Sequence, residues 1–250
     1  MQSRPAAGML PANFYTYITL MFGLIPTSLV VRKISDTDRS IFLTFDDGPT
    51  PDFTERVLDT LAEEGAKATF FVIGRRATKH IRILRRILAE SHSVFSHSTD
   101  HNFLHYFRTP GSIKAWVSRS LAELEDLTGM EQRMFRPPGG FVPPPLYMAA
   151  RSLRVPIVLW NHRFYDWVHP WTAERAQASL ERARPGDIVL LHDQQKEPHR
   201  PQFIRTLRDY VRGLRVEGLE PATLSNSRVV GEAFSEEAPR GVVARKGVGG

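Results

Sequence analysis

Short apolar runs alternate with amphipathic segments over residues 41–224 of the chain. The apolar runs have the length of buried strands, and we expect strands at 41–45, 68–73, 93–96, 134–135, 155–160, 187–191 and 222–224. Between them, apolar residues recur with helical spacing, which predicts helices over 50–65, 75–88, 111–128, 146–153, 172–184 and 203–214. Thr50 is expected to cap the first helix, with Pro51 in its first turn. This alternation predicts an α/β fold with a parallel sheet, a distorted or incomplete (β/α) barrel.

Polar residues follow the ends of several predicted strands. The residues at or just beyond these ends are Asp46, Asp47, His97, Arg136, Asp166 and His192. The carboxyl ends of parallel strands share one edge of a sheet, and α/β enzymes place their chemistry at that edge. We therefore expect these side chains to meet.

Asp46 and Asp47 end the first predicted strand and are followed directly by Gly48-Pro49. Neighbouring side chains of an extended strand face opposite ways, so two acids that serve one site need a sharp bend, which Gly48-Pro49 supplies. Two adjacent carboxylates at the mouth of a buried strand also need a cation, either a metal ion or an arginine. A solvated Asp-Gly turn is the competing interpretation.

His97 and His101 are four residues apart. If the turn between them is helical, both imidazoles face the same way, as in metal-binding histidine pairs. Two histidines and one carboxylate leave positions open for water and substrate, which is typical of a catalytic zinc site. A pair of surface histidines is the alternative, since His92 and His105 make this stretch rich in histidine.

Composition limits the kinds of metal site and partner that the chain can have. The 250 residues suffice for one large domain, and the absence of cysteine excludes disulfides and thiolate metal sites. The net charge of +6 favours an anionic polymer or a membrane surface as partner, or else reflects a basic but inert surface. Nucleic-acid binding is not expected, because the basic helix near residues 75–88 lacks interleaved aromatics. The oligomeric state is left open.

The segment 14–31, FYTYITLMFGLIPTSLVV, carries no charge and is close to the length of a bilayer span. It is interpreted as an uncleaved membrane anchor, an interfacial segment or an apolar arm packed on the domain. The tail from about residue 232 lacks periodicity and is expected to be disordered. The predicted organisation is an N-terminal apolar segment at 1–36, a catalytic domain at 37–230 and a tail at 231–250.

Between residues 41 and 224 the chain resembles the polysaccharide deacetylases of carbohydrate esterase family 4, which carry the NodB-homology domain. Motifs of that family stand in order along the sequence. They are TFDDGP at 44–49, H-[ST]-x-x-H at 97–101, Arg136-Pro137-Pro138, Asp166-Trp167 and Leu190-Leu191-His192.

The resemblance implies a role for each matching residue. It implies that Asp47, His97 and His101 hold a divalent metal, usually zinc, with cobalt or manganese as alternatives. It assigns the role of general base to Asp46, oriented by Arg136. It assigns the role of general acid to His192, with Asp166 as its partner. It places Trp167 and Leu190 around the acetyl methyl group. Many relatives have tyrosine where this chain has Gly139, so the backbone donor of the oxyanion hole is kept while a groove wall is expected to be lost.

The function expected from this resemblance is metal-dependent removal of N-acetyl groups from a glycan of the cell envelope. The expected location is the cell envelope or its membrane, and otherwise the cytoplasm. One alternative is an amidase, a deformylase or an O-acetyl esterase that acts on a small or lipid-linked substrate. Another is a non-catalytic carbohydrate-binding protein on the same scaffold.

Overall fold

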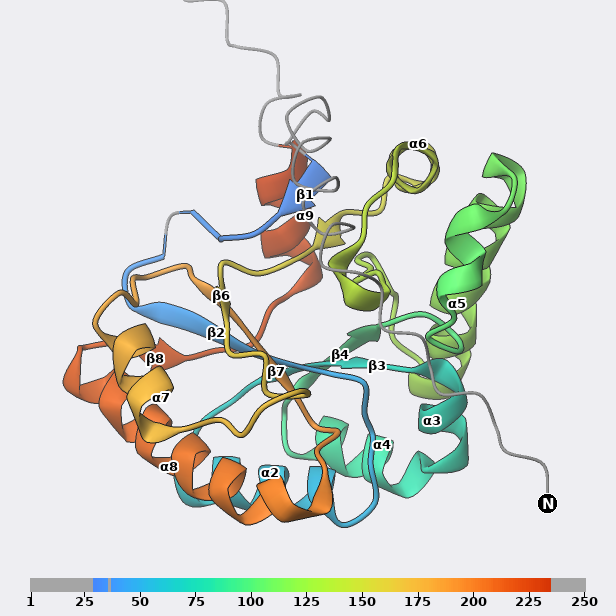
Figure 1. Cartoon of the computed structure of the whole chain (residues 1–250). Helices are drawn as coiled ribbons and strands as arrows, with labels where there is room; N and C mark the ends of the chain where they lie inside the picture. Colours follow the sequence, from blue (N-terminus) through green and yellow to red (C-terminus); the bar gives the residue numbers. More distant parts are fainter. Residues whose placement is uncertain (1–28, 36, 235–250) are drawn as a thin grey trace, which may run out of the picture.

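The computed structural model describes residues 29–35 and 37–234, and its central feature is a parallel sheet (Figure 1). The strand order is β4-β3-β2-β7-β6, and β8 pairs with the beginning of β2. These strands are β2 (Ser40–Asp46), β3 (Thr69–Val72), β4 (Ser93–Ser96), β6 (His162–Arg163), β7 (Ile188–His192) and β8 (Glu220–Pro221). The register sets Asp46 opposite His192, which brings the ends of β2 and β7 together.

A second, two-stranded sheet continues from the β4 edge of the first. It pairs β1 (Val30–Val31) with β5 (Ile157–Val158), and Phe135 bridges β5 to Ser96 at the end of β4. Among the described residues the strands make no closed barrel, so the expected α/β fold with an incomplete barrel is confirmed. β5 is shorter than the predicted 155–160; the carbonyls of Val158, its last residue, and of Leu159 accept hydrogen bonds from Arg136.

Helices cover the sheet (Figure 1). They are α2 (Phe53–Glu63), α3 (Gly74–Lys79), α4 (Ile81–Ala89), α5 (Pro110–Thr128), α6 (Pro144–Leu153), α7 (Ala173–Leu180), α8 (Arg200–Val216) and α9 (Asn226–Phe234). In Figure 1, α2, α4 and α8 lie below the sheet, α5 lies to its right, and α6 lies above it, in contact with α5. Phenylalanines fill the layer next to α2 and α8; Phe45 stacks on Phe70 at 5.1 Å, and Phe53 meets Phe203 edge-on.

Several helix boundaries differ from the predictions. α2 begins at Phe53 rather than near Thr50, because the Thr50 N–H donates to Thr54 Oγ1 and the Asp52 N–H donates to Glu55. The predicted basic helix is two helices, broken at His80, whose φ of −120° and ψ of 45° are not helical. α7 ends at Leu180, before the predicted end at 184. The strand predicted at 222–224 is β8, at residues 220–221.

The described fold extends beyond the predicted 37–230 at both ends. β1 packs against β5, with Leu29 and Val31 each 2% exposed, and α9 continues to Phe234. Most of the apolar segment 14–31 lies outside the described residues, as does the tail from 235. Within the described part of the chain, no helix has both the length and the apolar character that crossing a bilayer requires.

A buried polar cluster secures the amino end of β7. The Asp187 carboxylate accepts hydrogen bonds from His162 at 2.9 Å and Asn161 at 2.6 Å, and it pairs with Lys33 at 3.0 Å. Burial alone raises the pKa of Asp187, but these donors outweigh it and hold the pKa below its usual value. Ser179 completes a Ser-His-Asp chain through His162, yet Ser179 is only 2% exposed, so this chain of hydrogen bonds is structural.

Candidate active site

The predicted polar residues converge at the carboxyl edge of the sheet. Asp46 is the last residue of β2 and lies opposite His192, the last residue of β7. His97 follows β4 directly, and its Nε2 lies 3.7 Å from Asp46 Oδ2. Arg136 follows the bridging residue Phe135 and donates to Asp46. The structure thus brings together residues that are up to 146 positions apart, Asp46 and His192 being the extremes.

Asp47, His97 and His101 form a compact cluster of potential metal ligands. One oxygen or nitrogen from each lies within 4.8 Å of the others. Asp47 Oδ1 is 3.5 Å from His97 Nε2 and 3.2 Å from His101 Nε2. The bend expected at Gly48-Pro49 begins one residue earlier, since Asp47 itself has a φ of +74°. This left-handed conformation, which aspartate tolerates better than most residues, lets both neighbouring carboxylates serve one site.

The turn between His97 and His101 is not helical, so the condition under which their spacing alone would pair the imidazoles is not met. Ser98 and His101 have φ values of +68° and +54°, and the His101 N–H donates to Ser98 Oγ at 3.0 Å. The loop folds back and sets the two imidazole rings 5.1 Å apart. Asp100 turns away from the cluster and binds His105 at 3.2 Å, so it supports neither ligand directly.

The cluster fits a divalent cation. His97 Nδ1 lies 2.8 Å from the Arg136 carbonyl oxygen, which can only accept, so Nδ1 carries the proton. Burial, reinforced by the charge of His101, lowers the pKa of His97 to about 3, so its ring is neutral and Nε2 offers a lone pair. A histidine ligand held this way by a backbone carbonyl is typical of metal sites. Asp47 Oδ1 is buried and, among the described residues, accepts no hydrogen bond, which leaves it for a cation.

Arg136 holds Asp46 in place. Its Nη1 donates to Asp46 Oδ1 at 2.7 Å and to Thr44 Oγ1 at 2.8 Å, and the side chain is fully buried. Its Nε and Nη2 donate to the carbonyls of Val158 and Leu159. Burial lowers the pKa of Arg136, and the Asp46 charge opposes the shift. Arginine remains charged, so one oxygen of Asp46 is fixed while Oδ2 faces the cluster.

His192 is paired with Asp166. Its Nδ1 donates to Asp166 Oδ1 at 3.0 Å, while its backbone N–H donates to Oδ2 at 2.8 Å. Gln195 also donates to Oδ2, at 2.8 Å, so both carboxylate oxygens are engaged. Burial alone lowers the pKa of His192, but the attraction of Asp166 outweighs it and raises the pKa to about 9. The imidazole is therefore a cation at neutral pH.

Of the residues implied for the acetyl pocket and the oxyanion hole, Trp167 lies beside His192. The Trp167 ring is 4.8 Å from that of His192 and is 39% exposed. Leu190 is 2% exposed in β7, where it pairs with Thr44 and Arg163. Gly139 lies in the 3₁₀ turn η4 (Pro138–Gly140) with a φ of +63°, in the loop that follows Arg136.

Sequence reasoning missed three supports of the site. Thr44 positions Arg136, and Gln195 positions Asp166. Asp193, fully buried beside His192, accepts from Thr54 Oγ1 at 2.6 Å, and a Cβ at Gly48 would overlap its carboxylate. Burial raises the pKa of Asp193 to about 7. The only signal in the sequence for these three residues was that each lies in or near a motif. That signal does not separate a supporting residue from a solvated one.

Comparison with known proteins agrees with this geometry. A family model described as polysaccharide deacetylase matches residues 33–158. A peptidoglycan-N-acetylglucosamine deacetylase of Bacillus cereus is 31% identical over 212 residues, which cover 81% of this chain and 94% of the relative. A chitooligosaccharide deacetylase of Sinorhizobium fredii is 35% identical over 159 residues, which cover 62% of this chain and 72% of the relative.

Solved structures give the same result. The structure of a peptidoglycan N-acetylglucosamine deacetylase superposes with a TM-score of 0.71 at 26% identity, covering 78% of this chain and 91% of the other. The resemblance inferred from the motifs is confirmed. The chain belongs to the polysaccharide deacetylase family, of the type known as carbohydrate esterase family 4.

Proposed function

We propose that this protein is a metal-dependent hydrolase that removes N-acetyl groups from amino sugars of a glycan in the cell envelope. One observation carries the proposal. The Asp47–His97–His101 cluster lies between a carboxylate held by an arginine and a cationic imidazole. The substrates named for the two curated relatives, peptidoglycan and chitooligosaccharides, are both built from N-acetylated sugars and support the substrate class.

An amide resists hydrolysis because its carbonyl is a poor electrophile and its amine is a poor leaving group. A divalent cation held by Asp47, His97 and His101 supplies Lewis acidity, which lowers the pKa of water and polarises a carbonyl. We propose zinc as that cation, because neutral imidazole and carboxylate ligands with open positions suit it.

Asp46 is proposed as the general base. Its Oδ1 is held by Arg136 at 2.7 Å, so the proton of the attacking water passes to Oδ2, which faces the cluster. Its position beside His97, rather than among the three ligands, keeps its lone pairs available for this proton. Arg136 fixes the orientation of the carboxylate, since a positioned base is effective only within hydrogen-bond reach of the water.

His192 is proposed as the general acid. The amine must be protonated as the C–N bond breaks, and a histidine kept cationic by Asp166 can give that proton from Nε2. The products are then acetate and the free amino sugar. The Gly139 N–H is proposed to stabilise the oxyanion, with Trp167 and Leu190 enclosing the acetyl methyl group.

The alkaline limb of the pH–rate profile is expected to report His192. A raised pKa means that the cation persists below about 9, so turnover is expected to fall as the pH rises through that value. In Asp166→Asn the attraction is lost while burial still lowers the pKa of His192, so the limb should move toward neutral pH by about 2 units. The measurement is kcat against pH for both proteins, and an unmoved limb would contradict the assignment of His192.

The function is tested by acetate release across a panel of substrates. The purified protein is stripped with a chelator, reloaded with zinc, and incubated with peptidoglycan, N-acetylglucosamine oligomers, acetylated xylan and small amides. We expect acetate from the N-acetylated glycans only when metal is present. Activity confined to acetylated xylan or to small amides would replace the proposal with an esterase or an amidase. Glycan binding without any release would indicate a carbohydrate-binding protein.

A further inference from the structure

The ring of Phe103 occupies the space that a side chain at position 139 would need. A Cβ built on Gly139 would lie 3.0 Å from Phe103 Cε1 and 3.2 Å from Cζ, so the ring packs directly over the glycine. The same ring meets the imidazole of the potential ligand His101 edge-on, with the ring centroids 5.3 Å apart. Phe103 thus stands over Gly139, where the family resemblance implied that a groove wall would be lost.

The position of Phe103 is fixed by its own segment. Phe103 opens the 3₁₀ helix η3 (Phe103–Phe107), where Asn102 Oδ1 accepts from the Leu104 N–H at 2.9 Å. Tyr106 Oη donates to the Pro138 carbonyl at 2.9 Å, which ties η3 to the loop that carries Gly139. Tyr106 is only 6% exposed, and its ring lies 6.0 Å from that of Phe103. This clamp holds the phenyl ring beside the site in a defined place.

Phe103 nevertheless presents surface to a ligand. It is 38% exposed, and Trp167 on the side of His192 is 39% exposed. The electron-rich face of an aromatic ring attracts polarised C–H groups. The C–H bonds on one face of a pyranose ring are such groups, whereas a small amide offers no comparable face.

We propose that Phe103 is a sugar-binding residue of this site, on which a pyranose ring of the glycan stacks, and that the absence of a side chain at Gly139 makes room for it. This inference rests on the proposed deacetylase function. It assigns to Phe103 a role in binding the chain of sugars. It therefore predicts that the protein prefers oligomers to monomers and that this preference depends on Phe103.

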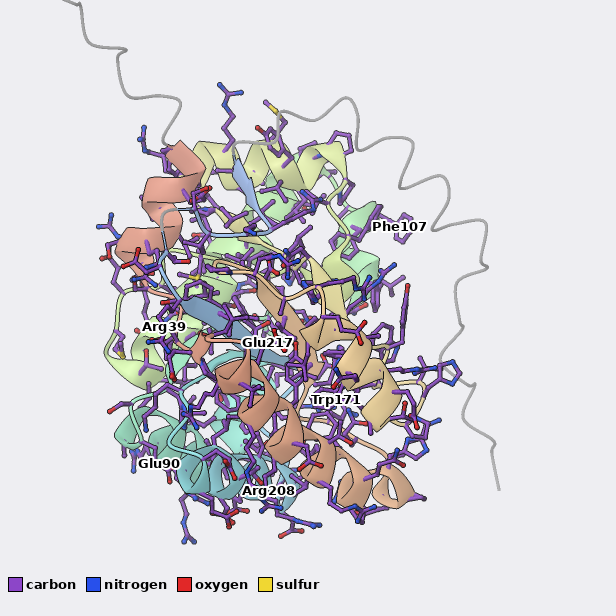
Figure 2. All side chains as sticks on the ribbon, turned by 90° about the vertical axis from the view of Figure 1, so that its left-hand side faces the viewer. Arg39, Glu90, Phe107, Trp171, Arg208 and Glu217 are labelled. Atoms are coloured by element: carbon purple, nitrogen blue, oxygen red, sulfur yellow. The ribbon has the colours of Figure 1, made fainter. Side chains whose placement is uncertain are left out.

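The test compares Phe103→Ala with a matched control. Phe107→Ala removes the same ring from the same 3₁₀ helix, but Phe107 is 71% exposed and projects from the surface (Figure 2). Kinetics are measured with N-acetylglucosamine oligomers and with the monomer. For Phe103→Ala we expect KM for the oligomer to rise about fivefold, with kcat and the kinetics of the monomer nearly unchanged. Phe103→Tyr, which keeps a ring, should retain the low KM, and Phe107→Ala should match the unmodified protein.

The bound metal is measured in every variant. If Phe103 only holds His101 in position, Phe103→Ala will lose bound metal and its kcat will fall on all substrates alike. That result would overturn the proposal. An unchanged ratio of oligomer to monomer activity in a metal-loaded Phe103→Ala protein would also overturn it. Failure of the deacetylase assignment has a different signature, namely that the unmodified, metal-loaded protein releases no acetate from any glycan.

Discussion

Replacing Asp46 by asparagine is expected to lower kcat by about 10²–10⁴-fold, the usual contribution of a positioned general base. Asparagine keeps an oxygen that can accept the hydrogen bond from Arg136, now 2.7 Å long, so the variant should fold. The asparagine side chain cannot take a proton from water at neutral pH. Because Asp46 is not one of the three clustered ligands, bound zinc should remain at the level of the unmodified protein. Acetate release and metal content of the same preparation are the measurements.

Asp52→Asn is a matched control for this change. Asp52 is an exposed aspartate in the same loop, and its φ of +64° is one that asparagine also tolerates. It should retain full activity. Near-normal turnover in Asp46→Asn would show that another group takes the proton, and loss of metal would move Asp46 into the ligand set.

Replacing His101 by asparagine is expected to abolish both metal binding and measurable activity. His101 Nε2 lies 3.2 Å from Asp47 Oδ1, and its removal leaves two of the three candidate ligands. Asparagine suits the φ of +54° at this position, so the loss should reflect the missing imidazole rather than a disturbed loop. Zinc per protein chain after dialysis, thermal unfolding with and without zinc, and acetate release together test this expectation.

His105→Asn provides the comparison. His105 belongs to the same loop, but its Nε2 binds Asp100 at 3.2 Å and its ring stacks on Trp116 at 4.7 Å. It should bind zinc normally and show the same zinc-dependent rise in Tm as the unmodified protein. Equal zinc content in His101→Asn and the unmodified protein would remove His101 from the ligand set.

The positions of the chemical groups were predictable because they follow from strand ends. The run Ile41–Phe45 reads as a buried strand, and parallel pairing alone carries its terminal acids to the edge that also receives His97 and His192. The spacing of His97 and His101 would pair the two rings on a helix, whereas the structure sets them 5.1 Å apart across a loop. The helical explanation failed because Ser98 and His101 adopt left-handed conformations, which no periodicity reveals.

Features set by contacts between distant segments were not predictable. Phe103 lies over Gly139, 36 positions later, and Tyr106 of the same 3₁₀ helix donates to the Pro138 carbonyl, a contact that the sequence does not reveal. The basic helix reads as continuous in sequence, yet its break at His80 depends on backbone angles fixed by packing. The roles of Thr44 and Gln195 likewise depend on where Arg136 and Asp166 come to lie.

The left-handed backbone at Asp47 and His101 also bears on how this protein could change over evolutionary time. Few residue types accept such φ angles, chiefly glycine, asparagine, aspartate and histidine. Among these four types, asparagine and glycine preserve the loops but bind a cation weakly or not at all. A single change of Asp47 or His101 to asparagine or glycine is therefore expected to give a folded protein that no longer holds the cation.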